Sequence, residues 1–124
     1  MARILVIDDD EQINFFLKES FSLEGYEVDT AKDGAEAKAL YTENDYDVIV
    51  TDIIMPSQDG FEVILDLRHR GLSNRVIAIS GGGRVSADDY LVTASSFDVA
   101  ATFQKPLDRK AILAKAKQII EAAG

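Results

Sequence analysis

The chain has 124 residues, of which 47% are hydrophobic and 28% are charged, and this is the size and composition of one globular domain. It contains no cysteine, which excludes disulfides, thiolate metal sites and cysteine nucleophiles. The net charge of −9 argues against direct nucleic-acid binding, because that function normally needs a basic surface.

The N-terminal segment has the features of neither a membrane anchor nor a cleaved leader. Its single basic residue, Arg3, precedes an apolar run that stops at three aspartates and is too short to span a bilayer. We therefore expect a cytoplasmic protein with no membrane insertion. Met1 and the short C-terminal tail favour a complete protein, with one domain over residues 1–124 and no output domain.

Five short apolar segments recur along the chain and predict strands. Several are continuous and rich in β-branched residues, as in parallel strands that are buried on both faces. In chain order, the predicted strands are 3–7, 26–30, 47–51, 75–79 and 100–103.

Between these strands, apolar residues return every three or four positions, which predicts helices. The expected inward faces are Ile13, Phe16, Leu17 and Phe21, then Ala37, Leu40 and Tyr41, then Phe61, Ile64 and Leu65, then Leu91, Ala94 and Ser95, and finally Ile112, Ala116, Ile119 and Ile120. Asp9 or Asp10 is placed to cap the first helix and Asp108 the last. Five alternations of strand and helix predict an α/β fold, a doubly wound five-stranded parallel sheet.

Polar groups end four of the predicted strands. In an open α/β sheet, ligands bind at the carboxyl ends of the strands. The residues found there are Asp8, Asp9 and Asp10, then Asp52, then Ser80, and then Lys105. Each alone could be a helix cap, a turn residue or a solvated lysine, but four strands that all end in this way indicate a site.

Such a cluster needs either a proton on one acid or a cation. Two carboxylates about 4 Å apart repel by roughly 4 kcal/mol at an effective dielectric constant of 20, so either one is protonated or a cation enters. Oxygen ligands without histidine or cysteine select a hard ion such as Mg²⁺. A metal ion and a lysine together would stabilise an incoming phosphoryl group, and an aspartate beside it could act as the nucleophile.

The motifs at these strand ends resemble those of the receiver domains of two-component signalling, over roughly residues 2–122. The matching segments are Ile-Leu-Val-Ile-Asp-Asp-Asp at 4–10, Val-Ile-Val-Thr-Asp-Ile-Ile-Met-Pro at 48–56, Asp59-Gly60, Ala-Ile-Ser at 78–80 and Lys105-Pro106. The resemblance implies a (βα)5 flavodoxin-like receiver fold. It also implies a protein that catalyses only its own phosphoryl transfer and dephosphorylation and is otherwise no enzyme.

The resemblance further implies the ligands of the metal ion. Asp52 would be the phosphoacceptor and, with Asp9, would ligate Mg²⁺ through its side chain. Asp8 would act mostly through a metal-bound water, and Ile54 would contribute its backbone carbonyl. Mn²⁺ is the expected substitute ion.

Two further groups would contact the phosphoryl group. Ser80 would donate a hydrogen bond to a phosphoryl oxygen, and Lys105 would form an ion pair with it. In this family the Lys105–Pro106 peptide bond is usually cis, an isomer that only X–Pro bonds adopt at low cost.

The expected partners are a histidine kinase or histidine phosphotransfer protein and a downstream protein target. The target would bind the face formed by the fourth helix, the fifth strand and the fifth helix, with Tyr90 a candidate contact. Many relatives have an aromatic residue at the switch position that Thr102 occupies here, and Phe103 should face the opposite side of the sheet. We therefore expect phosphorylation to act by ordering the loop 81–83 and shifting the fourth helix.

Three alternatives lead to different functions. An aspartyl-nucleophile hydrolase of the haloacid-dehalogenase type would need an acid at the position of Ile54. A flavodoxin-like electron carrier would place the flavin phosphate against Asp8, Asp9 and Asp10, which would repel it. A pseudo-receiver would bind partners without phosphorylation. His69, the single histidine, is expected at the surface and not as a phosphoryl donor.

Overall fold

The computed structural model describes residues 1–53, 60–80 and 98–123. Strands and helices alternate along the described chain, as the sequence predicts. They are β1 (Arg3–Ile7), α1 (Glu11–Leu23), β2 (Glu27–Ala31), α2 (Gly34–Glu43), β3 (Val48–Asp52), α3 (Gly60–His69), a short 3-10 turn (Ser73–Arg75), β4 (Val76–Ser80), β5 (Ala101–Gln104) and α5 (Arg109–Ala123). The fourth predicted helix, with Tyr90, lies outside the described residues.

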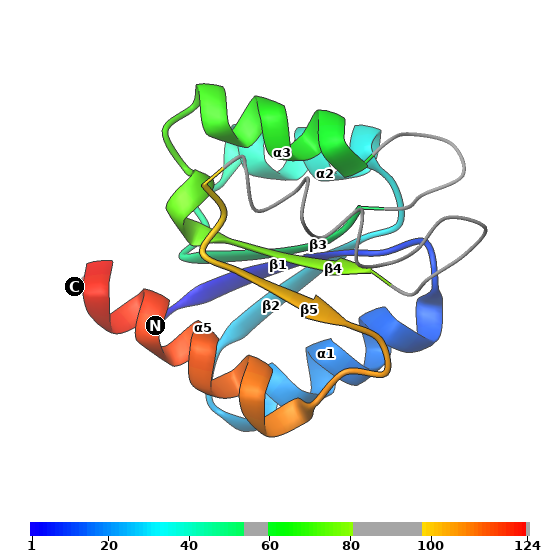
Figure 1. The fold of residues 1–124 in the computed structure, drawn as a ribbon, viewed down its shortest axis with the longest axis vertical. Helices are drawn as coiled ribbons and strands as arrows, with labels where there is room; N and C mark the ends of the chain where they lie inside the picture. Colours follow the sequence, from blue (N-terminus) through cyan, green and yellow to red (C-terminus); the bar gives the residue numbers. More distant parts are fainter. Residues whose placement is uncertain (54–59, 81–97, 124) are drawn as a thin grey trace.

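The five strands form one parallel sheet in the order β2-β1-β3-β4-β5. Helices α2 and α3 cover one face and α1 and α5 the other, so the sheet is doubly wound (Figure 1). This confirms the predicted fold class. From β1 the chain adds β2 on one side of the sheet, and from β3 it adds β4 and β5 on the other side. Ligands in open α/β sheets bind at such a switch point, which here lies between β1 and β3.

Each face of the sheet has its own apolar core, because successive strand residues point to opposite sides. Under α2 and α3, strand residues such as Leu5 and Ile49 pack with Tyr41 and Leu67. Under α1 and α5, a second cluster joins the remaining strand residues to both helices; it includes Ile4, Val6, Leu17, Phe21, Ile112 and Ala116. The two cores hold the strand ends in fixed positions, where the candidate site lies.

Helices α1 and α3 end in the same way, at Gly25 and Gly71. Both glycines have positive φ, +89° and +76°, and the residue after each donates its N–H to a carbonyl five residues back. This is the Schellman motif, in which glycine adopts the left-handed conformation at low cost. At their other ends, Asp10 and Asp33 cap α1 and α2 through their side chains, and Asp108 does so for α5.

The sequence placed four of the five strands one residue too early. The strands β2 to β5 each begin and end one position later than predicted. In β3, β4 and β5 the closing residue is polar and still pairs in the ladder, since Asp52 pairs with Ile79 and Ser80 pairs with Gln104. The prediction for α3 was wrong at Leu65, which is exposed, whereas Val63, Ile64 and Leu67 are buried. No helix in the described part of the chain is both long enough and apolar enough to span a bilayer.

Candidate functional site

The carboxyl ends of four strands bring the predicted polar residues to one edge of the sheet. Ile7 of β1 pairs with Thr51 of β3, so the next residues, Asp8 and Asp52, lie side by side. On the other side of β3, Ser80 closes β4. The N–H of Lys105 donates to the Ser80 carbonyl at 2.8 Å, which places the start of the β5 loop beside them.

Three carboxylates form the centre of this edge. One oxygen from each of Asp8, Asp9 and Asp52 lies within 4.8 Å of the others. Asp8 and Asp52 are buried, whereas Asp9 is exposed, so the cluster is open to solvent on one side. This set of oxygen ligands fits a hard divalent cation that retains several waters, as Mg²⁺ does.

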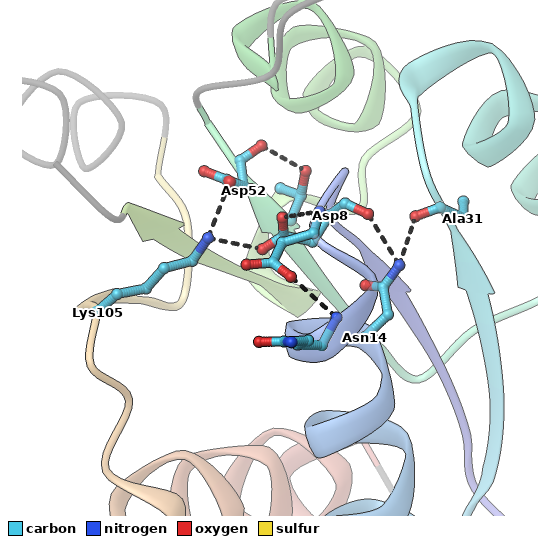
Figure 2. Close-up of polar contacts among 8 residues, drawn as sticks. Asp8, Asn14, Ala31, Asp52 and Lys105 are labelled. Atoms are coloured by element: carbon cyan, nitrogen blue, oxygen red, sulfur yellow. Dashed lines mark hydrogen bonds and ion pairs between the residues drawn. The ribbon is translucent and has the colours of Figure 1, made fainter. Parts of the chain in front are cut away.

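Lys105 supplies the positive charge nearest to these acids. Its Nζ lies 2.9 Å from Asp8 Oδ2 and 3.1 Å from Asp52 Oδ2, so one ammonium group bridges two buried carboxylates (Figure 2). Burial by itself would lower the pKa of Lys105, but the hydrogen bond to Asp8 and the charges of Asp52 and Asp8 outweigh it and raise this pKa. Lys105 is therefore a stable cation that offsets the repulsion between the acids.

Burial raises the pKa of Asp8 to about 6, and the charge of Asp52 adds to this effect. The hydrogen bonds with Lys105 and with the backbone of Asp10 oppose the rise. The Asp8 carboxyl thus exchanges its proton in the weakly acidic range, where a bound cation would favour the ionised form.

The loop after β1 is held by backbone as well as side-chain contacts. The N–H of Asp8 donates to the Ala31 carbonyl of β2 at 3.1 Å, and Asp8 Oδ1 accepts from the N–H of Asp10 at 2.9 Å. Asp10 Oδ1 in turn accepts from the N–H of Gln12 and caps α1. Of the two caps considered from the sequence, Asp10 is the observed one.

Asn14 is a residue of this edge that the motifs in the sequence did not indicate. Its Nδ2 donates to the carbonyl oxygens of Asp8 and Ala31, at 2.8 and 3.2 Å (Figure 2). Asn14 lies three residues before Leu17 and seven before Phe21, on the same helix face. A polar residue in the middle of an apolar stripe was the available signal.

The two predicted switch residues lie on neighbouring strands, Ser80 at the end of β4 and Thr102 on β5. Ser80 is fully buried, and its Oγ has no hydrogen-bond partner among the residues that the structure describes. Thr102 is half-buried and pairs with Ala78, whereas Phe103 packs in the core on the other side, as predicted. Within the described residues, the Ser80 hydroxyl thus has unused hydrogen-bonding capacity.

Two smaller expectations are confirmed, and two fall outside the described residues. The Lys105–Pro106 peptide bond is cis. His69 is exposed at the end of α3. Ile54 and the loop 81–83 belong to the part of the chain that the structure does not describe, so the expected carbonyl ligand and loop ordering stay predictions.

Comparison with known proteins agrees with this geometry. The model of the response regulator receiver domain family matches residues 4–117. The response regulator MprA of Mycobacterium sp. (strain KMS) is 40% identical over an alignment of 99 residues that covers 73% of this chain and 43% of MprA. The transcriptional regulatory protein TcrA of Mycobacterium tuberculosis is 33% identical over 88% of this chain and 47% of its own length. The chain thus spans less than half of these relatives.

Two solved structures are similar over nearly their whole length. The Francisella response regulator 1452 receiver domain has a TM-score of 0.88 at 27% identity, with 100% of both chains covered. The response regulator TrrA of Thermotoga maritima, solved in complex with Mg(2+)-BeF, has a TM-score of 0.83 at 32% identity, with 96% of this chain and 99% of TrrA covered.

Proposed function

Because the chain belongs to the response regulator receiver domain family, we propose that it accepts a phosphoryl group on Asp52 in a Mg²⁺-dependent reaction. The observation that carries this proposal is the arrangement at the sheet edge. Three carboxylates lie close enough to share one cation, and Lys105 bridges two of them. We propose that residues 1–124 act as one receiver domain.

Asp52 is the nucleophile in this proposal. One of its carboxylate oxygens forms a bond to phosphorus, the bond from phosphorus to the donor's nitrogen breaks, and that nitrogen keeps the electron pair. Asp9 and Asp52 would hold a Mg²⁺ ion, with Asp8 acting through water and the Ile54 carbonyl as a further ligand, and the ion would supply charge neutralisation for the transferred group. Mn²⁺ is the proposed substitute.

Lys105 and Ser80 stabilise the product. The ammonium of Lys105 already touches an oxygen of Asp52, so it is placed to pair with the phosphoryl oxygens attached there. The hydroxyl of Ser80 is buried and has its donor unused among the described contacts, which suits a hydrogen bond to the same group. Thr102 is the proposed switch position on β5. Because its side chain is small, we propose that ordering of the loop 81–83 makes up the larger part of the response to phosphorylation.

We further propose that the phosphoryl donor is a histidine kinase or histidine phosphotransfer protein. The phosphorylated form would bind a downstream protein target through the face formed by the fourth predicted helix, β5 and α5, and the chain itself would not bind nucleic acid. Its own chemistry would be limited to accepting and losing the phosphoryl group, in the cytoplasm.

Incubation with a small-molecule phosphodonor and intact-mass spectrometry test the proposal. We expect one added phosphoryl group on the wild-type protein with Mg²⁺, none with a chelator, and none on Asp52→Asn. Asp45→Asn, which changes an exposed aspartate, is the matched control and should be modified like the wild type.

Two results would contradict this function. A phosphorylated Asp52→Asn variant would show that the acceptor is elsewhere, and an unmodified wild-type protein would favour a pseudo-receiver. Multiple turnover of a phosphate monoester, with release of free phosphate, would instead favour the aspartyl-nucleophile hydrolase.

A further inference from the structure

Asn14 is a buried amide on the inner side of α1, among apolar neighbours. Only 9% of its surface is exposed, and it lies on the same helix face as Leu17 and Phe21. An apolar residue would pack there without any need for hydrogen bonds. The amide therefore has to be explained by what it touches, because a buried polar group lowers stability unless it is bonded.

The contacts fix which way the amide points. Both acceptors, the Asp8 and Ala31 carbonyls, are oxygens, so only the nitrogen of Asn14 can face them. The side-chain oxygen then points away, and it is buried without a hydrogen-bond partner in the described part of the chain. The two donated bonds are therefore the described contacts that offset the burial of this amide.

These two bonds control the peptide that links Asp8 to Asp9. The N–H of Asp8 donates to the Ala31 carbonyl, and the Asp8 carboxylate accepts from the N–H of Asp10. The Asp8 carbonyl accepts from Asn14 Nδ2. Asp9 follows that carbonyl directly, and its side chain is exposed. The position of the Asp9 carboxylate relative to Asp52 therefore depends on the backbone that Asn14 holds.

We propose that Asn14 is a positioning residue for the metal site, which holds the β1–α1 loop so that Asp8 and Asp9 face Asp52 before any cation binds (Figure 2). It also ties this loop to the end of β2, so that a movement of either strand end alters the acid cluster. This inference rests on the proposed function, because it presumes that the cluster binds Mg²⁺.

Mg²⁺ binding to Asn14→Leu, measured by an NMR amide-shift titration, tests the proposal. Leucine has nearly the shape of asparagine and suits the apolar surroundings, but it donates no hydrogen bond. We expect Mg²⁺ to bind about tenfold more weakly, at the lower end of what loss of an outer hydrogen bond costs a metal site. At saturating Mg²⁺, the phosphorylation rate should return most of the way to the wild-type rate, because Asn14 touches neither Asp52 nor the phosphoryl group.

Ser20→Ala is the matched control. Ser20 is also polar, on α1 and buried, and its Oγ accepts from Arg109 Nε at 3.1 Å, away from the acids. This variant should lose thermal stability in the absence of metal and keep the wild-type Mg²⁺ affinity within twofold. A purely structural role for Asn14 predicts the same outcome for Asn14→Leu, and that outcome would overturn the inference.

Asn14→Ser provides a second test if Asn14→Leu does not fold. The serine hydroxyl is too short to reach both carbonyls, so its Mg²⁺ affinity should also fall, in a protein whose far-UV circular dichroism is that of the wild type. Unchanged affinity in a folded Asn14→Ser would likewise count against the role. If the wild-type protein bound no Mg²⁺, both this inference and the proposed function would fail, whereas wild-type binding with unaltered variants would remove the inference alone.

Discussion

Asp8, unlike the exposed Asp9 and Asp10, is a fully buried acid whose carboxylate is already paired. Its carboxylate has the Lys105 ammonium on one oxygen and the Asp10 N–H on the other. Burial nevertheless dominates and raises its pKa from 3.8 to about 6. The metal-free site therefore takes up a proton under mildly acidic conditions, which should be visible in the stability of the whole chain.

The pH dependence of stability follows from the sign of this shift. Between about pH 4 and 6 the folded protein binds the Asp8 proton and the unfolded protein does not, so the free energy of unfolding falls as pH rises through this window. The difference between 3.8 and about 6 corresponds to about 3 kcal/mol. Urea unfolding of the wild type and Asp8→Asn at pH 4.5 and 7, without metal, measures the part of this difference that falls between the two pH values, about 2 kcal/mol.

Asp8→Asn removes this titration, and it should therefore lose stability between the two pH values less steeply than the wild type. Saturating Mg²⁺ should flatten the wild-type dependence too, because a cation favours the ionised carboxylate. Equal slopes for the two proteins would mean that Asp8 does not titrate in this range.

At the scale of the elements, the sequence predicts most of the strands and helices, but it predicts less well the residue at which each one ends. Apolar runs such as Val76–Ile79 identify β4, but the polar Ser80 also belongs to its ladder, and nothing in its side chain indicates that. In the same way, Asp52 closes β3 although it reads as a loop acid.

The acid cluster could be predicted because the carboxyl ends of parallel strands always meet at one edge. The Asn14 contacts could not, because their partners are backbone carbonyls of two other segments, and a carbonyl is present at every residue. The Lys105–Asp8 pair also depends on the exact register of strands and loop. Sequence patterns thus predicted which groups gather, and the structure was needed for their pairing.

Gly25 gives a test of how a helix end depends on its backbone conformation alone. A Cβ added there would meet no atom within 4 Å, so the only cost of Gly25→Ala is the left-handed conformation at φ +89°. We expect the free energy of unfolding to fall by about 1–2 kcal/mol, with the Mg²⁺ affinity unchanged because the site is at the other end of α1. Gly25→Asn should lose less, since asparagine tolerates this region; equal losses in urea unfolding would indicate another cause.

At the scale of the whole molecule, the two cores provide stability and the sheet edge reduces it. Asp8 and Asp52 are taken out of water, and in the metal-free protein one ammonium group compensates both. Removing one partner of a buried ion pair is strongly destabilising, because the remaining charge is left uncompensated. Lys105 is therefore both a phosphoryl-binding candidate and a counter-ion for the metal-free fold.

Lys105→Met should separate these two roles. Without Mg²⁺ at pH 7.5, we expect the free energy of unfolding to fall by about 3 kcal/mol, since the methionine fills the space but leaves the acids without their cation. Mg²⁺ should bind more tightly to this variant than to the wild type, because the charge that repels the ion is gone. At a fixed Mg²⁺ concentration, the ion should then raise the free energy of unfolding of Lys105→Met by more than it raises that of the wild type.

Urea unfolding with and without Mg²⁺ measures both effects, and Lys117→Met is the control. Lys117 pairs with Glu121 on the exposed side of α5, where an ion pair contributes little. Its variant should match the wild type in both conditions. If Mg²⁺ stabilised Lys105→Met no more than the wild type, the ammonium group and the metal ion would not compete for the same carboxylates. The cation would then have to bind on the side of Asp9 and Asp52 that Lys105 leaves open.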